Sequence, residues 1–198
     1  MTATVGDGRP PGPGRTRLHE AALRLFAEHG ISGTSLQMIA DEMGVTKAAV
    51  YHHYKTKDDL VVGVVAPFLD RVLEIVERAR ARRGRRAQVE TALAGLVDLI
   101  VEVRRIYVVA AVDPVFAHLQ EHHPRMREIG EELRELLAGP DADDERRVAT
   151  VFFLTGMVGP LGDETCRDIP DDALRGMLMD IGRRFLLPRR APRMVSCR

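Results

Sequence analysis

Hydrophobic residues recur at intervals of three and four along most of the chain, which is the spacing of an amphipathic helix. The first such stripe ends at Gly30 and consists of Leu18, Ala21, Ala22, Leu25 and Phe26. Later stripes predict a helix over residues 57–80, which Pro67 should kink, and others within 89–100, 106–112, 126–137, 148–161 and 174–185. No stretch alternates for long as a strand does. We therefore predict an all-α fold of about nine helices.

Two short helices are predicted between residues 34 and 54, with a turn at Gly44 between them. Thr34 is followed three residues later by Gln37, a capping-box pattern that predicts the start of the first of these helices. Thr46 is predicted to cap the second helix, KAAVYHHY. This layout, over about residues 35–54, is a helix-turn-helix, whose second helix enters the major groove of DNA.

The second short helix divides into a core face and an exposed face. Val50 and Tyr54 are four residues apart, so we expect both to face the core. The opposite surface then carries side chains suited to DNA, with small residues that allow close approach: Lys47, Ala48, Tyr51 and His52, flanked by Ala49 and His53. Ser35 and the backbone N–H groups that open the first helix offer an anion site.

The positions of the lysines support a helix-turn-helix that binds DNA, whereas the net charge of the chain does not. The chain has 29 Lys+Arg and 29 Asp+Glu, so no net basicity indicates nucleic-acid binding. Its only three lysines, however, all lie within or beside the second short helix, at Lys47, Lys55 and Lys57. Ammonium groups clustered there can neutralise backbone phosphates.

The segment RLHEAALRLFAEHGISGTSLQMIADEMGVTKAAVYHHYKTKDDL resembles the DNA-binding domain of TetR-family transcriptional regulators. The resemblance covers residues 15–62, while the rest is similar to the family only in length and helical layout. It implies that Gln37 contacts a base, that Tyr51 and Lys57 hold phosphates, and that Lys47, Ala48, Ala49, His52 and His53 line the groove. Because Ala48 and Ala49 are small, specificity should depend on Gln37, Lys47 and His52.

The resemblance and the composition together predict four regions. Residues 1–14 are rich in Gly and Pro and are expected to form a flexible arm, followed by the DNA-binding domain, 15–62. Residues 63–187 are expected to form a helical ligand-binding and dimerisation domain, and 188–198 a basic tail. Arg9, Arg15 and Arg17 either reach a minor groove or simply form a solvated basic tail.

The DNA-binding domain, residues 15–62, is called the head below. Because so small a domain contacts few base pairs, we expect a homodimer on a palindromic operator. The predicted interface consists of the last two apolar stretches, 148–161 and 174–185. The first of them is apolar on all sides and contains glycines that permit close packing, and the second offers a matching apolar face. The interface residues we expect are Val151, Gly156, Gly159, Leu174, Met177, Leu178, Ile181 and Phe185. In the family these positions pair as a four-helix interface.

The stretches between the head and the interface can enclose a pocket with a few polar anchors, and the resemblance implies a small-molecule inducer. We expect a largely hydrophobic ligand of unknown identity and no other cofactor. The predicted lining is Tyr107, Asp113, Phe116, Phe152 and Thr155. The inducer would release a repressor by favouring a conformation whose two recognition helices are wrongly spaced.

Two alternatives stay open at the level of sequence. His118, His122 and His123, beside Glu121, suggest a metal-responsive regulator, because His118 and His122 are four residues apart, although Pro124 weakens this pattern. A non-allosteric helical interaction module is the other, and the sequence does not separate repressor from activator. We find no GxSxG, phosphate loop or nucleophile with a base, so the chain is not expected to be an enzyme.

Location is predicted from what the chain contains. Cys166 and Cys197 have no CxxC spacing, which favours free thiols in a reducing cytoplasm over a disulfide. The first residues, MTATVGDGRPPGPGR, hold Gly and Pro where a secretory signal needs an apolar run. No stretch approaches a membrane span. We therefore expect a cytoplasmic protein with no membrane partner.

Overall fold

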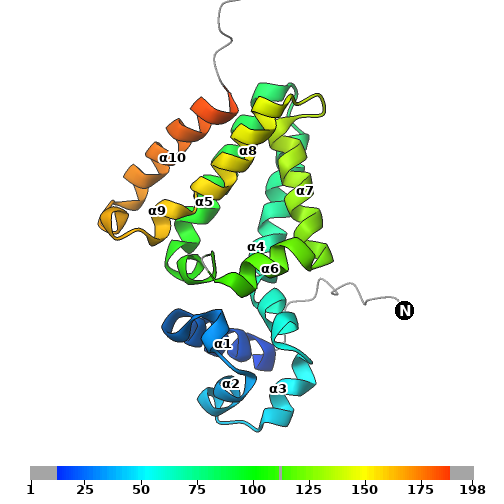
Figure 1. Ribbon diagram of the computed structural model, residues 1–198, viewed down its shortest axis with the longest axis vertical. Helices are drawn as coiled ribbons and strands as arrows, with labels where there is room; N and C mark the ends of the chain where they lie inside the picture. Colours follow the sequence, from blue (N-terminus) through cyan, green and yellow to red (C-terminus); the bar gives the residue numbers. More distant parts are fainter. Residues whose placement is uncertain (1–12, 112, 188–198) are drawn as a thin grey trace, which may run out of the picture. The chain divides into compact units, whose positions relative to one another are not determined.

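The computed structural model describes the backbone of residues 13–111 and 113–187, and the side chains of residues 14–104 and 113–187. These residues form helices and no strand, which confirms the all-α prediction (Figure 1). The helices are α1 (Pro13–Gly33), α2 (Leu36–Met43), α3 (Lys47–His53), α4 (Lys57–Arg80), α5 (Arg85–Ala111), α6 (Pro114–His122), α7 (Pro124–Ala138), α8 (Asp144–Gly156), α9 (Gly159–Gly162) and α10 (Asp171–Leu186), with a 3-10 turn at Glu164–Cys166. The predicted arm up to residue 12 and the basic tail lie outside the described residues.

The chain forms two compact units, Met1–Val65 and Ala66–Arg198, and α4 contributes to both. No described helix is long and apolar enough to cross a bilayer. In the first unit α2 packs on α1 and α3. Its interior is built from apolar side chains of all four helices: Leu18, Ala21, Ala22, Phe26, Ile31, Leu36, Ile39, Ala40, Val50, Leu60 and Val61.

The second unit is organised around α5, which α6, α7, α9 and α10 contact, while α8 packs on α7 and α10. The α5 side chains that build its interior are Val89, Ala92, Leu93, Leu96, Val97, Leu99, Ile100 and Val101. Helix boundaries fall where glycine and proline predicted them. Gly84 precedes α5, Pro114 and Pro124 are the first residues of α6 and α7, and Gly139 caps the end of α7.

Two predicted segments differ from the structure. Residues 89–100 and 106–111 belong to one helix, α5, since nothing between them breaks the backbone pattern, and residue 112 lies outside the described residues. The apolar stretch 148–161 is not one helix: α8 ends at Gly156 and the four-residue α9 begins at Gly159. Pro160 explains the break, because a proline ring clashes with the carbonyl four residues earlier, which here belongs to Gly156.

Candidate nucleic-acid interface

The turn between α2 and α3 has the caps that a helix-turn-helix needs. Gly44 ends α2 in the left-handed conformation (φ 66°), which a residue without a side chain adopts readily. Thr46 caps α3 as predicted, and its hydroxyl accepts a hydrogen bond from Ala49 N at 3.3 Å. These caps fix where both helices begin and end.

The start of α2 differs from the predicted capping box. Ser35, not Thr34, is the N-cap, and its hydroxyl accepts from Met38 N at 3.2 Å. Thr34 is buried, and its hydroxyl faces the carbonyls of Leu25 and Gly30, at 3.2 and 2.8 Å. Thr34 therefore ties the end of α1 to the start of α2, next to Gly30, whose backbone leaves the helical conformation.

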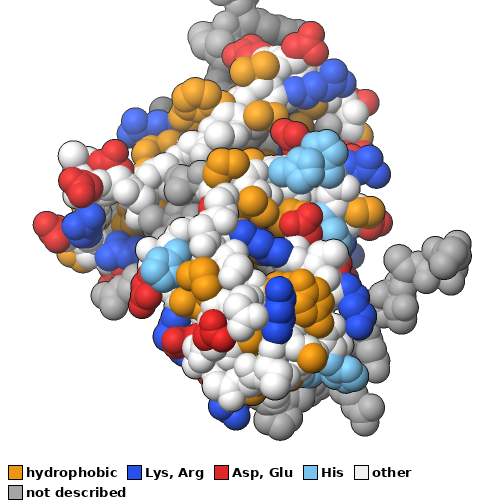
Figure 2. All heavy atoms as spheres, turned by 60° about the horizontal axis from the view of Figure 1, so that its bottom comes forward, with side chains coloured by type: hydrophobic (Ala, Val, Ile, Leu, Met, Phe, Trp, Pro, Cys, Tyr) orange, Lys and Arg blue, Asp and Glu red, His pale blue; other side chains and the backbone are white. Residues whose placement is uncertain are grey.

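The exposed face of α3 contains the side chains expected there. Val50 and Tyr54 are buried, while every other residue from Thr46 to His53 is exposed. The small side chains Ala48 and Ala49 leave the helix backbone accessible between larger neighbours. Figure 2 shows basic and histidine side chains between hydrophobic ones on the surface turned toward the viewer.

All three lysines line one hollow of about 540 Å³. The first turn of α2, the exposed face of α3 and the start of α4 surround it. Its lining is Ser32, Gly33, Thr34, Ser35, Leu36, Gln37, Lys47, Tyr51, Lys55, Thr56 and Lys57. The hollow thus combines three ammonium groups with the positive end of the α2 dipole, an arrangement that favours anions.

Neighbouring groups orient Lys47 and Lys57, the two lysines to which the family resemblance assigns DNA contacts. Lys57 donates from Nζ to the Ser32 carbonyl at 3.0 Å, which holds it beside the start of α2. Lys47 Nζ lies 5.6 Å from the centroid of the Tyr51 ring, within the range of a cation–π interaction. Tyr51 itself is 38% exposed, so its hydroxyl is accessible to a ligand.

Gln37, the predicted base-contacting residue, is exposed on α2. Its side-chain Nε2 donates to Asp41 Oδ1 at 2.7 Å. Glu42, the next acidic residue, instead pairs with Arg24, whose Nε lies 3.1 Å from Glu42 Oε1. The Gln37 carboxamide is therefore held by one specific partner one helical turn away.

A cluster of polar groups fixes Tyr54, the residue that ends α3. Arg15 donates from Nε to the Tyr54 hydroxyl at 2.7 Å, and the same hydroxyl lies 2.5 Å from His19 Nε2. Arg15 and Arg17 are therefore part of α1, and Arg15 is bound to Tyr54, which corrects the expectation that both belong to the basic arm, while Arg9 lies outside the described residues. Burial, followed by the positive charges of Arg15 and His53, lowers the pKa of His19 to about 4.

This cluster predicts that the protein loses stability in mild acid. His19 is neutral when folded, whereas its pKa in the unfolded chain is about 6.5, so between pH 6.5 and 4 the unfolded state binds the extra proton. The contribution of His19 to the free energy of unfolding is fully present above about pH 6.5 and is lost as the pH falls toward 4. We expect this group to contribute a loss of about 1–2 kcal/mol, reduced from the full value because the side chain is only partly buried and solvent screens it.

Urea unfolding at a series of pH values measures this loss. His19→Gln, whose amide oxygen can accept from Tyr54 but does not titrate, should show a correspondingly weaker dependence over the same range. An identical pH slope in both proteins would contradict the assignment.

The predicted dimer residues fall on two sides of the C-terminal helices. Val151, Gly156, Gly159, Met177, Ile181 and Phe185 are exposed, whereas Leu174 and Leu178 are only 3% exposed. Leu174 and Leu178 belong to the core of the second unit. Together with Gly182 and Leu186 they form the buried face of α10. The α10 stripe read from the sequence therefore merges a buried face with an outer apolar face.

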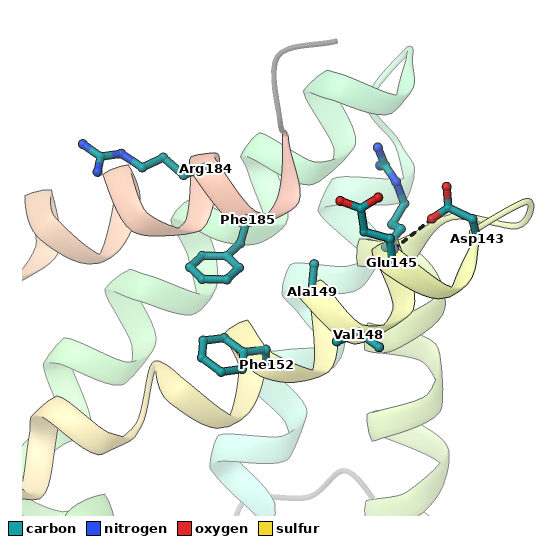
Figure 3. A pocket seen from close by; sticks show the side chains of 8 residues that line it. Asp143, Glu145, Val148, Ala149, Phe152, Arg184 and Phe185 are labelled. Atoms are coloured by element: carbon teal, nitrogen blue, oxygen red, sulfur yellow. Dashed lines mark hydrogen bonds between the residues drawn. The ribbon is translucent and has the colours of Figure 1, made fainter. Parts of the chain in front are cut away.

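The outer face is continuous across α8 and α10. The rings of Phe152 and Phe185 stack there, with centroids 5.3 Å apart and planes 21° from parallel. Asp143 and Glu145 lie toward one end and Arg184 toward the other, with the two rings between them (Figure 3). The remaining apolar members are Val148, Val151, Met177 and Ile181.

The predicted ligand-pocket residues do not come together. Phe152 is 63% exposed on the outer face and Thr155 is also exposed, so both line hollows there rather than an enclosed site. Asp113 and Phe116 are buried, and Asp113 caps α6 by accepting from Val115 N at 2.9 Å. The side chain of Tyr107 lies outside the described residues. Sequence spacing placed these residues on helices but did not resolve which side each faces.

The histidine cluster does not assemble into a metal site within the described residues, which hold no suitable group of three His, Cys, Asp or Glu. His118 and His122 stack with centroids 4.2 Å apart, and the Nδ1 of His122 lies 2.9 Å from the His118 carbonyl. His123 instead lies between α6 and α7, where it is the N-cap residue of α7.

The sequence analysis missed two hydrogen-bonded side-chain pairs in the first unit, Gln37 with Asp41 and Thr56 with Asp59, although the residue spacing of each pair indicates it. Asp41 follows Gln37 by four residues, the spacing of a side-chain pair on one helix face. Thr56 and Asp59 have capping-box spacing, and each accepts from the other's backbone N–H, at 3.0 and 3.1 Å. The contacts of Arg15 and His19 with Tyr54 link residues too distant in sequence for such a pattern.

Comparison with known proteins identifies the first unit. Residues 18–64 match the family described as bacterial regulatory proteins, tetR family. The HTH-type transcriptional repressor KstR2 of Mycolicibacterium smegmatis is 37% identical over 60 residues, which are 30% of this chain and 29% of KstR2. The regulator AcrR of Shigella flexneri is 53% identical over 47 residues, 23% of this chain and 22% of AcrR. The matches thus span less than a third of these relatives, all of which are regulators and not enzymes.

Solved structures extend the similarity of fold to most of the chain. The fatty acid degradation regulator FadR from Bacillus halodurans has a TM-score of 0.68 at 15% identity, covering 93% of this chain and all of FadR. KstR2 of Mycobacterium tuberculosis has a TM-score of 0.64 at 18% identity, covering 88% of this chain and 95% of KstR2. The chain therefore contains the DNA-binding domain of the TetR family of transcriptional regulators, and its described residues have the all-helical fold of that family.

Proposed function

We propose that this protein is a homodimeric transcriptional repressor that binds a palindromic operator through α2 and α3 and is released by a small, largely hydrophobic ligand. The observation that carries the proposal is the hollow lined by all three lysines at the start of α2. Such a regulator acts on the chromosome, so we propose a cytoplasmic location.

In the proposed complex α3 lies in the major groove. Lys47, Ala48, Ala49, His52 and His53 face the bases there, and Gln37 reaches a base from α2. Tyr51 and Lys57 contact phosphates on either side of the groove. Thr46, together with Ser35 and the first N–H groups of α2, binds the sugar-phosphate backbone through hydrogen bonds.

The outer face of α8 and α10 supports the proposed dimer. A contiguous exposed apolar patch commonly marks an interaction site, and this one includes the stacked rings of Phe152 and Phe185. Charges of both signs lie at its edges, with Asp143, Glu145 and Arg146 at one end and Arg184 at the other, so a second copy related by a two-fold axis can form ion pairs there. Gly156 and Gly159 face open space, so a second copy can approach the backbone there.

The ligand is proposed to bind inside the second unit. One solved relative by fold, FadR from Bacillus subtilis, was determined in complex with stearoyl-CoA. In this chain the Thr150 hydroxyl is buried and has no hydrogen-bond partner among the described residues, so it is available as a polar anchor. His123 Nδ1 is likewise buried without a partner among the described residues, and an apolar interior with so few polar atoms suits a hydrophobic ligand with few polar groups.

Selection of duplexes from a random pool, followed by titration of the enriched duplex, tests DNA binding. We expect wild-type protein to enrich an inverted repeat. The Lys47→Ala, Tyr51→Ala double variant should bind it on the order of 100-fold more weakly, because it lacks one charged groove contact and one phosphate contact. Repeating the wild-type titration with stearoyl-CoA as a first effector probes release.

Arg86→Ala is the matched control, because it also removes one exposed positive charge but lies on α5, outside the head. It should bind the operator as wild type does at the same salt concentration. Equal affinity of wild type and double variant for the enriched duplex would refute the proposed interface.

A further inference from the structure

The hydrogen bond between Gln37 and Asp41 determines which atoms of Gln37 are available to DNA. An ionised carboxylate only accepts hydrogen bonds, so the partner of Asp41 Oδ1, 2.7 Å away, must be the amide nitrogen of Gln37. One of the two Nε2 hydrogens is thereby used. The carboxamide keeps its oxygen and its second N–H for another partner, and the bond to Asp41 fixes which end of the carboxamide carries which group.

We infer that Asp41 is a positioning residue that fixes the Gln37 carboxamide to read an adenine, an inference that rests on the proposed DNA-binding function. In the major groove adenine offers N7 as an acceptor and N6 as a donor, which match the remaining N–H and oxygen of Gln37. Guanine offers acceptors at both N7 and O6, so the Gln37 oxygen would face an acceptor. Cytosine and thymine satisfy only one of the two groups.

Electrostatics supports a specific role for Asp41. Gln37 and Asp41 are both exposed, so their hydrogen bond contributes little to folding. They lie one turn apart on the same face of α2, which places a negative charge close to the surface that meets phosphates. Such a charge weakens sequence-independent binding. Orientation of Gln37 is the compensating effect that the geometry offers.

The test compares the ratio of operator affinities for adenine and guanine at one position. That position is the one where Gln37→Ala abolishes the base preference of wild-type protein in the selected operator. We expect adenine there in wild type, and we expect Asp41→Ala to reduce the adenine-over-guanine ratio by about tenfold. Binding of Asp41→Ala to unrelated duplexes should be equal to wild type or tighter, because a negative charge is lost.

Two further variants separate orientation from charge. Asp41→Asn keeps an oxygen that can accept from Gln37 and should retain most of the preference. Glu42→Ala removes a neighbouring charge on α2 without touching Gln37, and should leave the ratio unchanged. Circular dichroism and thermal melting of each variant verify that the head is folded.

The outcomes distinguish this inference from the proposed function. If wild type enriches no duplex, both are refuted. If wild type enriches an inverted repeat but the base read by Gln37 is not adenine, or Asp41→Ala keeps the wild-type ratio, only the role of Asp41 fails. A loss in Asp41→Asn as large as in Asp41→Ala would likewise overturn it, because the effect would then come from charge.

Discussion

Replacing Phe152 with arginine should convert the proposed dimer into a monomer. Phe152 is 63% exposed and stacks on Phe185 near the middle of the outer apolar face of α8 and α10. In a two-fold interface each copy would bury a new, unpaired guanidinium, and an uncompensated buried charge costs about 3–5 kcal/mol. Because two such charges are buried in the dimer, we expect its dissociation constant to rise by more than about a thousandfold.

Sedimentation at micromolar concentration measures this change. Wild type should sediment as a dimer and Phe152→Arg as a single 22.0 kDa species. Gln120→Arg is the matched control, since it adds the same charge at an exposed position on α6. A wild-type protein that sediments as a monomer, or a Phe152→Arg variant that remains a dimer, would contradict the proposed interface.

Placing a methyl group on Gly63 should destabilise the first unit by about 2–4 kcal/mol, the range for overpacking combined with disrupted buried contacts. A Cβ at Gly63 would lie 2.6 Å from Cε1 and Cζ of the Tyr54 ring, far inside van der Waals contact. Tyr54 is 5% exposed and held by Arg15 and His19, so it has little room to move.

Thermal unfolding of wild type, Gly63→Ala, Tyr54→Ala and the double variant isolates this clash. Gly63→Ala should be much less harmful in a Tyr54→Ala background, because the ring it meets is then absent. Gly33→Ala is the control in the same unit, since its Cβ would meet only His29 Cβ at an ordinary 3.5 Å. Equal losses from Gly63→Ala with and without the Tyr54 ring would contradict the packing described here.

The head was predictable from sequence because its determinants are local. Thr46 caps α3, and Val50 and Tyr54 are buried as their spacing predicts. The residues expected on the exposed face of α3 are exposed, and the three lysines line one hollow. Where two caps stood next to each other, at Thr34 and Ser35, the pattern chose the wrong one, because only the tertiary contact with Leu25 and Gly30 distinguishes them.

The second unit was less predictable because its helices have apolar residues on more than one side. The α10 stripe combined Leu174 and Leu178, which face inward, with Met177, Ile181 and Phe185, which do not. Phe152 was placed in an inner pocket for the same reason. Periodicity gives the spacing of apolar residues, but the side that faces the core depends on which helices pack against it.

In the proposed complex two copies of this chain bind one inverted repeat, each through its DNA-binding domain. Native mass spectrometry of the complex with the selected duplex gives the number of chains bound. We predict two chains of 22.0 kDa on each duplex, and on a duplex with one half-site scrambled a much weaker complex. A stable complex of one chain per duplex, unaffected by the loss of a half-site, would contradict the account.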